Sequence, residues 1–117
     1  MINDNRHSAY VNLARQALET YIRNGETISP MSGLPREMLE QKAGVFVLIK
    51  NRDQLRGCIG TVRPTRENIA QEIIQNAISA GTKDPRFYPI KQDELGNLSY
   101  SVDILREYEP VESVKEL

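Results

Sequence analysis

The sequence predicts an α+β fold, with a mixed β-sheet built on a central hairpin and two main helices packed on it. Three patterns indicate this class. Residues 8–24 and 65–81 repeat apolar side chains at three- and four-residue steps, as amphipathic helices do. Between them, residues 45–49 and 55–62 are two β-type runs separated by a polar turn. Residues 98–105 then alternate apolar and polar side chains, which is typical of a half-exposed strand.

Local signals place the helix boundaries. Gly25 stands where the first helix should have its C-terminal cap. A loop over residues 26–35 leads to a short helix over 36–41, with Pro35 near its first turn. Thr65 is expected to cap the N-terminus of the second main helix, and Gly81 is expected to close that helix.

The hairpin should lie at the centre of the sheet. Its first strand is apolar on both faces, which predicts burial on both sides. The turn over residues 51–54 lacks Asn-Gly and Asp-Gly, so a loop longer than two residues is expected. The helix that follows is long enough for a crossover, and the strand order stays open. The whole chain, 1–117, is expected to form one domain with an acidic tail over 106–117.

Composition excludes several classes of function. The 117 residues carry a net charge of −1 and 6% aromatic residues, which argues against double-stranded nucleic acid and against a base-stacking platform. One cysteine and one histidine exclude the multi-cysteine and two-histidine metal motifs, and no nucleotide fingerprint is present. We therefore expect no metal and no cofactor. The sequence lacks a signal peptide and an apolar run long enough for a membrane span, so we expect a cytoplasmic protein.

The most unusual segment is Leu55–Gly60, because Gly57 and Gly60 weaken a strand. We expect a bulge, a sharp bend, or the close approach of another backbone or a ligand to offset this cost. Strict alternation would place Arg56 and Cys58 on the same face, and a cation beside a thiol favours the nucleophilic thiolate. Cys58 is therefore the candidate catalytic residue. The alternative is that Cys58 is a small structural side chain and Arg56 is solvated.

Two other segments could complete a site. The Asp84–Phe87 loop is expected to form the neighbouring wall, with Arg86 either contacting a ligand or forming a structural ion pair. Ser101 and Asp103 lie on the polar face of the last strand and would join the site if that strand lay beside residues 55–62. The predicted binding residues are Arg56, Gly57, Cys58, Gly60, Asp84, Arg86, Ser101 and Asp103.

The hexapeptide Leu55–Gly60 resembles the signature of the AMMECR domain family, and the flanking segments agree with this resemblance. The matching segments are Ala43–Val47, Pro64-Thr65, Asn76-Ala77, Asp84–Phe87 and Tyr100–Leu105. The resemblance covers the chain from about His7 to Val111. It implies a mixed α/β unit with a larger and a smaller lobe and a functional surface at the hexapeptide. It implies no accepted reaction.

The resemblance also suggests partners. The chain is similar to protein A of the AmmeMemoRadiSam set, whose genes often neighbour those of a Memo-like protein and a radical-SAM protein. Family domains usually continue beyond the equivalent of Leu117, so the domain is expected to be C-terminally short. Missing strands would leave a sheet edge uncovered, and self-association through that edge is then expected.

Two hypotheses about function follow, and they belong to different classes. In the first, the chain is a binding or adaptor module that presents the hexapeptide surface to a protein partner or a small anionic ligand. In the second, it is an enzyme that uses Cys58 as a nucleophilic or redox thiol, activated by Arg56, with Asp84 or Asp103 as proton acceptor. We favour the binding module and keep the enzyme as the alternative, because the sequence offers one histidine, no set of metal ligands, no cofactor motif and no catalytic base near Cys58.

Overall fold

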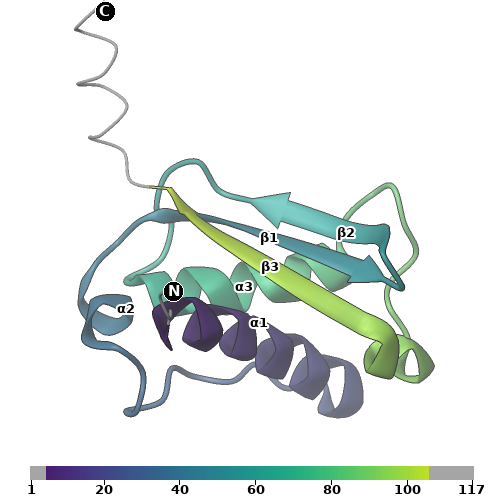
Figure 1. Ribbon diagram of the computed structural model, residues 1–117, viewed down its shortest axis with the longest axis horizontal. Coiled ribbons are helices and arrows are strands. Elements are labelled where there is room, and N and C mark those ends of the chain that lie inside the picture. Colours follow the sequence, from purple (N-terminus) through teal and green to yellow (C-terminus); the bar gives the residue numbers. More distant parts are fainter. Residues whose placement is uncertain (1–4, 106–117) are drawn as a thin grey trace, which may run out of the picture.

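The computed structural model describes residues 5–105, so the predicted acidic tail lies outside the described residues (Figure 1). Two long helices and one three-stranded sheet make up most of this part of the chain. In chain order, the elements are α1 (Asn5–Asn24), α2 (Arg36–Glu40), β1 (Gly44–Asn51), β2 (Gln54–Gly60), α3 (Ile69–Thr82), the 3-10 helix η1 (Gln92–Asn97) and β3 (Leu98–Leu105).

The predicted α+β class is confirmed, and the strand order is β2-β1-β3. Both outer strands pair antiparallel with β1, so the described strands contain no parallel neighbours and the sheet is not mixed. The sheet is antiparallel because the crossover through α3 places β3 next to β1 and not next to β2. Because β2 and β3 both oppose β1, they run parallel to each other, and α3 connects them across the intervening strand (Figure 1).

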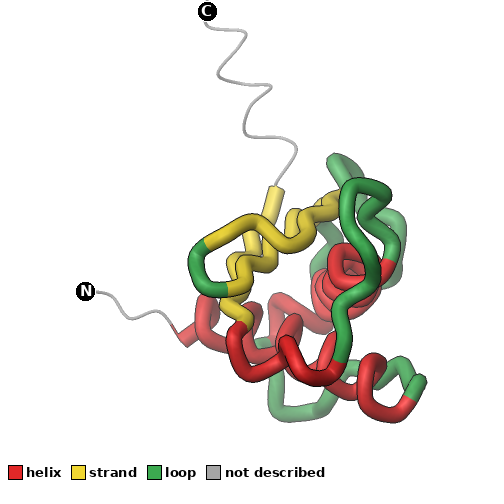
Figure 2. Tube along the Cα trace, turned by 90° about the vertical axis from the view of Figure 1, so that its right-hand side faces the viewer, coloured by secondary structure: helices red, strands yellow, loops and turns green. Residues whose placement is uncertain are grey.

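The helices α1 and α3 cover the same face of the sheet (Figures 1 and 2). Val45, Val47 and Ile49 of β1 are fully buried against them. The alternate residues Phe46 and Leu48 point to the other face, where Phe46 is 36% exposed and Leu48 is half-buried. The expectation that β1 is buried on both sides is therefore wrong for the described residues, since both helices pack on one side. We call the other side the open face.

The hairpin turn is shorter than expected. Asn51 pairs with Gln54, so only Arg52 and Asp53 form the turn. Both have positive φ angles, 51° and 70°, as a type I′ turn requires. No glycine is needed because tertiary contacts hold the turn. The backbone N–H of Arg52 donates to the carbonyl oxygen of Asn97 at 3.2 Å, and its guanidinium donates to the Asn97 side-chain oxygen.

The second main helix begins later than predicted. Asn68, not Thr65, caps α3, and its side-chain oxygen accepts a hydrogen bond from the backbone N–H of Gln71 at 2.9 Å. Thr65 instead donates to the carboxylate of Glu72 inside the helix. None of the helices within residues 5–105 is long and apolar enough to cross a membrane.

Candidate functional site

Two internal groups occupy the space beside the strand glycines. A Cβ atom on Gly57 would lie 2.0 Å from the backbone oxygen of Ala80, because α3 passes directly against β2. A Cβ atom on Gly60 would lie 2.3 Å from the ring of Phe46, which packs over this glycine on the open face. The close approach predicted from the two glycines therefore comes from the fold itself.

Strand β2 contains an irregularity at Arg56. Lys50 pairs with Leu55 and Ile49 pairs with Gly57, so Arg56 is the extra residue of a β-bulge. The bulge breaks the strict alternation on which the predicted Arg56–Cys58 pair depended. From Gly57 onward the alternation is regular.

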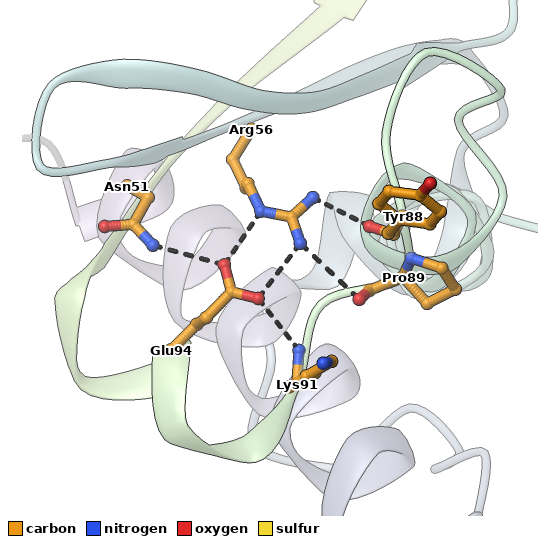
Figure 3. A network of polar contacts seen from close by, with 6 residues as sticks. All are labelled: Asn51, Arg56, Tyr88, Pro89, Lys91 and Glu94. Atoms are coloured by element: carbon orange, nitrogen blue, oxygen red, sulfur yellow. Dashed lines mark hydrogen bonds and ion pairs between the residues drawn. The ribbon is translucent and has the colours of Figure 1, made fainter.

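The guanidinium of Arg56 makes four hydrogen bonds that hold the fold together (Figure 3). It donates to both carboxylate oxygens of Glu94, from Nε at 2.8 Å and from Nη2 at 3.0 Å. It also donates to the backbone oxygens of Tyr88 at 2.8 Å and Pro89 at 3.4 Å. A bidentate, charge-assisted pair with two further acceptors is a strong structural anchor. This geometry favours the structural reading of Arg56 over ligand recognition.

Glu94 receives further support from its surroundings (Figure 3). The side-chain amide of Asn51 donates to Oε1 at 3.2 Å, and the backbone N–H of Lys91 donates to Oε2 at 3.1 Å. The hydrogen bond from Arg56 is the largest influence on this carboxyl group and holds its pKa below the usual range. The pair thus fastens β2 to η1 and to the loop that follows α3.

Asp84 fastens the same loop to Cys58. Its side chain is 3% exposed, and its Oδ2 accepts a hydrogen bond from the backbone N–H of Cys58 at 3.0 Å. Arg86 donates to it three times, from its backbone N–H and Nε to Oδ1 at 3.0 Å and from Nη2 to Oδ2 at 2.7 Å. The hydrogen bonds from Arg86 hold the pKa of Asp84 far below its ordinary value. The predicted neighbouring wall therefore lies directly against β2.

Phe87 lies between the two arginines of the site. Its ring centroid is 5.9 Å from the guanidinium carbon of Arg56 and 5.4 Å from that of Arg86. Both distances are within the range of cation–π attraction. The backbone N–H of Phe87 donates to the carbonyl oxygen of Asp84 at 3.1 Å and closes the turn. These contacts fix the shape of the loop next to Cys58.

The thiol of Cys58 is partly exposed on the open face, where Cys58 pairs with Leu48. Its side chain makes no hydrogen bond within the part of the chain that the structure describes. Arg86 interacts with it electrostatically, and this contributes to the raised pKa of Arg86, although the hydrogen bonds to Asp84 contribute more. Arg86, rather than Arg56, is thus the cation available to this thiol.

Ser101 and Asp103 do not lie beside β2. Their strand pairs with β1, where Ser101 is opposite Leu48 and Asp103 is opposite Phe46. Neighbouring strands are about 4.8 Å apart, so one intervening strand separates these residues from β2 by roughly 9–10 Å. Both face the open side, but they do not join Cys58 in one compact site.

A buried polar network behind the site was missed from the sequence. Glu72 is 1% exposed and accepts hydrogen bonds from the hydroxyls of Thr61 and Thr65, both at 2.7 Å, and from the backbone N–H groups of Thr65 and Arg66 at 2.9 Å. Burial alone would raise the pKa of Glu72, but these hydrogen bonds outweigh it and lower the pKa. The spacing from Ile69 to Glu72 to Ile73 places Glu72 on the apolar helix face, a signal that could have identified it.

The Glu72 network shapes the loop after β2 rather than Cys58 itself. This loop and α3 border an open groove of about 560 Å³. The groove is lined by Lys42, Pro64, Thr65, Arg66, Glu67 and Gln71. None of the predicted site residues lines it. Within the described residues, no three His, Cys, Asp or Glu side chains are grouped so that they could hold a metal ion.

Comparison with known proteins supports the resemblance carried by the hexapeptide. The model of the AMMECR1 family matches residues 11–117. The chain belongs to the AMMECR1 family. A Thermotoga maritima protein is 47% identical over 109 residues, which cover 92% of this chain and 63% of that protein. A Clostridium acetobutylicum protein is 50% identical over 101 residues, which cover 86% of this chain and 22% of that protein.

The fold is also shared with a solved member of similar sequence. The crystal structure of an uncharacterized protein from Pyrococcus horikoshii superposes with a TM-score of 0.81 at 35% identity, covering 99% of this chain and 61% of that protein. This AMMECR1 chain thus spans about three-fifths of the length of the Thermotoga and Pyrococcus proteins.

Proposed function

We propose that this AMMECR1 chain is a binding module that presents the Cys58 side of β2 and the adjoining Asp84–Tyr88 loop to a protein partner. The observation that carries the proposal is the saturation of Asp84 by four hydrogen bonds from Cys58 and Arg86. This carboxylate accepts a hydrogen bond from the backbone N–H of Cys58, yet its lowered pKa makes it a poor proton acceptor.

The second acceptor suggested for an enzyme is too far away to assist. Asp103 is separated from β2 by the whole of β1. A general base must lie within hydrogen-bond reach of its proton, directly or through one water molecule. Arg56 does not activate the thiol either, since Glu94 and two backbone carbonyls occupy its guanidinium. The catalytic hypothesis thus loses the groups that it assigned to proton transfer and activation.

The remaining exposed side chains suit recognition of a protein. Tyr88 is 86% exposed, and the Arg86 side chain is 56% exposed beside the partly exposed thiol. Tyrosine and arginine are among the residues that most often dominate binding energy at protein interfaces. Asp84 already neutralises Arg86, which makes this surface less suited to a small anion than to a mixed apolar and polar partner. The internal contacts of the loop fix its geometry before binding, which lowers the entropic cost of association.

The Memo-like and radical-SAM proteins encoded in the same genome are the first partners to test, as the gene context of similar proteins suggests. The experiment measures binding of each purified protein to the 117-residue chain by calorimetry. Tyr88→Ala should weaken the complex at least tenfold, because an exposed interface tyrosine often contributes more than about 1.4 kcal/mol. Met31→Ala, which removes a 37% exposed apolar side chain from the loop before α2, is the matched control and should bind like the parent.

The proposal for this surface would be contradicted if neither candidate protein bound. It would also be contradicted if Tyr88→Ala and Met31→Ala lost equal binding affinity. The catalytic alternative has its own test, because Arg86 lies near the thiol. If the chain is a binding module, iodoacetamide should alkylate Cys58 no faster in the native protein than in urea. A faster native reaction at neutral pH would favour a thiol enzyme activated by Arg86.

A further inference from the structure

The two outer strands of the sheet are protected very differently. The free edge of β2 is covered by the loop after α3, since Cys58 donates its backbone N–H to Asp84 and Arg56 binds the carbonyls of Tyr88 and Pro89. No strand within residues 5–105 pairs with the outer edge of β3. An edge of this kind exposes a row of unpaired N–H and C=O groups to any other strand.

The pairing pattern identifies those unpaired groups. The backbone N–H of Thr61 donates to the carbonyl of Val45 at 3.0 Å, so odd-numbered residues of β1 bond toward β2 and even-numbered ones toward β3. Ser101, which is opposite Leu48, therefore bonds to β1, and the even-numbered residues of β3 direct their N–H and C=O groups outward. These are Leu98, Tyr100, Val102 and Ile104.

Strand β3 carries only one of the devices that usually discourage edge pairing, the charge of Asp103. Its eight residues, Leu98–Leu105, include no proline, glycine or lysine, and its pairing with β1 has no bulge. We infer that β3 pairs antiparallel with β3 of a second copy of this chain, about a two-fold axis at Ser101. The three-stranded sheet is thereby extended into one continuous sheet twice as wide.

The strand is self-complementary in this register. Tyr100 faces Val102 of the partner subunit on the helix-covered side, an aromatic and β-branched pair of the kind that stabilises sheets. On the open face, Ser99 faces Asp103 of the partner subunit, so a hydroxyl meets the only charged side chain of the strand. Ser101 faces its own symmetry mate, where a small side chain suits the close approach of a pair that shares no hydrogen bonds. No like charges oppose each other.

This dimer would leave the proposed partner surface free. Strand β2 lies on the side of β1 opposite to β3, so the two copies would carry their Cys58 surfaces on the two outermost strands. A partner with two binding sites would then gain avidity without new contacts. The inference does not depend on the proposed function, because Tyr88→Ala should leave dimer formation unchanged.

The experiment uses sedimentation velocity of the 117-residue chain over a range of concentrations. The parent should form dimers. Ser101→Lys and Ser101→Asp should each weaken self-association at least tenfold, because like charges then oppose each other across the axis. An equimolar mixture of these two variants should associate again, as a heterodimer. Ser101→Thr is the matched control, since it is uncharged and favours strands, and it should dimerise like the parent.

Circular dichroism shows whether each variant folds, and amide hydrogen exchange provides the second measurement. The N–H groups of Tyr100 and Val102 should become protected as concentration rises, whereas that of Ser101, already bonded to β1, should be protected at every concentration. A parent that stays monomeric at its highest soluble concentration would overturn the inference. So would a Ser101→Lys variant that folds and still dimerises, or a mixture of the two charged variants that stays monomeric.

Discussion

Replacing Arg56 by alanine tests whether this arginine holds the fold or serves a ligand. In the structure, the substitution removes a bidentate ion pair with Glu94 and two hydrogen bonds to backbone carbonyls. The side chains of Arg56 and Glu94 are only 17% and 21% exposed. The pair therefore lies between exposed ion pairs, which contribute about 0.2–1 kcal/mol, and buried ones, whose disruption costs about 3–5 kcal/mol. We expect Arg56→Ala to lower the free energy of unfolding by about 2–3 kcal/mol.

Equilibrium unfolding in urea measures this loss. For a denaturant slope of about 1–3 kcal/mol/M, the midpoint should fall by roughly 0.7–3 M. Arg36→Ala is the matched control, because Arg36 and Glu40 form an ion pair whose side chains are 83% and 59% exposed. That variant should stay within about 0.5 kcal/mol of the parent. Arg56→Lys should recover only part of the loss, since an ammonium group cannot reproduce the planar guanidinium contacts.

The difference between parent and Arg56→Ala should also depend on pH. Arg56 lowers the pKa of Glu94 in the folded chain, from an ordinary value of 4.5. A carboxyl group whose pKa is lowered by folding stabilises the protein above its unfolded-state pKa, and this contribution is lost as pH falls through the folded-state pKa. The difference in free energy of unfolding between the parent and Arg56→Ala should therefore become smaller below about pH 4.5. An Arg56→Ala variant that unfolds like the parent at neutral pH would refute the structural role and return Arg56 to the list of ligand-binding residues.

Three further substitutions test the packing behind the site, each measured by urea unfolding. Gly57→Ala should destabilise the chain by more than about 1–3 kcal/mol, because its Cβ would lie 2.0 Å from the Ala80 oxygen, whereas Gly33→Ala has open space and should be nearly neutral. Glu72→Gln should lower stability most at neutral pH and progressively less in acid, since the lowered pKa of this carboxyl makes its contribution vanish as it protonates. Val47→Asp should cost several kcal/mol by placing an unpaired charge in the core, and a parent-like variant would contradict the core assignment.

Elements defined by short-range patterns were predictable from the sequence. The strict alternation of residues 98–105 gave the bounds of β3, and its even-numbered side chains do face the core from Leu98 to Val102. Helical spacing gave α1 and α3, and Gly25 ends α1 with a positive φ of 74°. Each of these signals is complete within one short segment, so it can be recognised without knowing the rest of the fold.

Features set by long-range contacts were not predictable in the same way. Strand β3 pairs with β1 because the connection through α3 crosses over β1 before the chain returns to the sheet. No local signal in residues 98–105 specifies which strand β3 will pair with. The two-residue turn without glycine depends on hydrogen bonds from Arg52 to Asn97, far along the chain. The role of Arg56 depends on Glu94, which lies 38 residues further along the chain, so no local pattern around Arg56 singles it out. The two strand glycines raised the possibility of a bulge, but side-chain alternation could not place it at Arg56.

The hexapeptide therefore divides into residues that build the fold and residues that remain available. Arg56 and Gly57 are committed to internal contacts, one through Glu94 and the other through the close approach of α3. Gly60 is covered by Phe46. Cys58 differs from all three, because the fold uses its backbone and leaves its thiol partly exposed beside Arg86. Leu55 is also accessible, since it is 41% exposed, so the hexapeptide combines positions that build the fold with two side chains that remain available for contacts. If this surface binds a partner as we propose, binding should depend on Leu55, Cys58 and their exposed neighbours, and not on the motif as a whole.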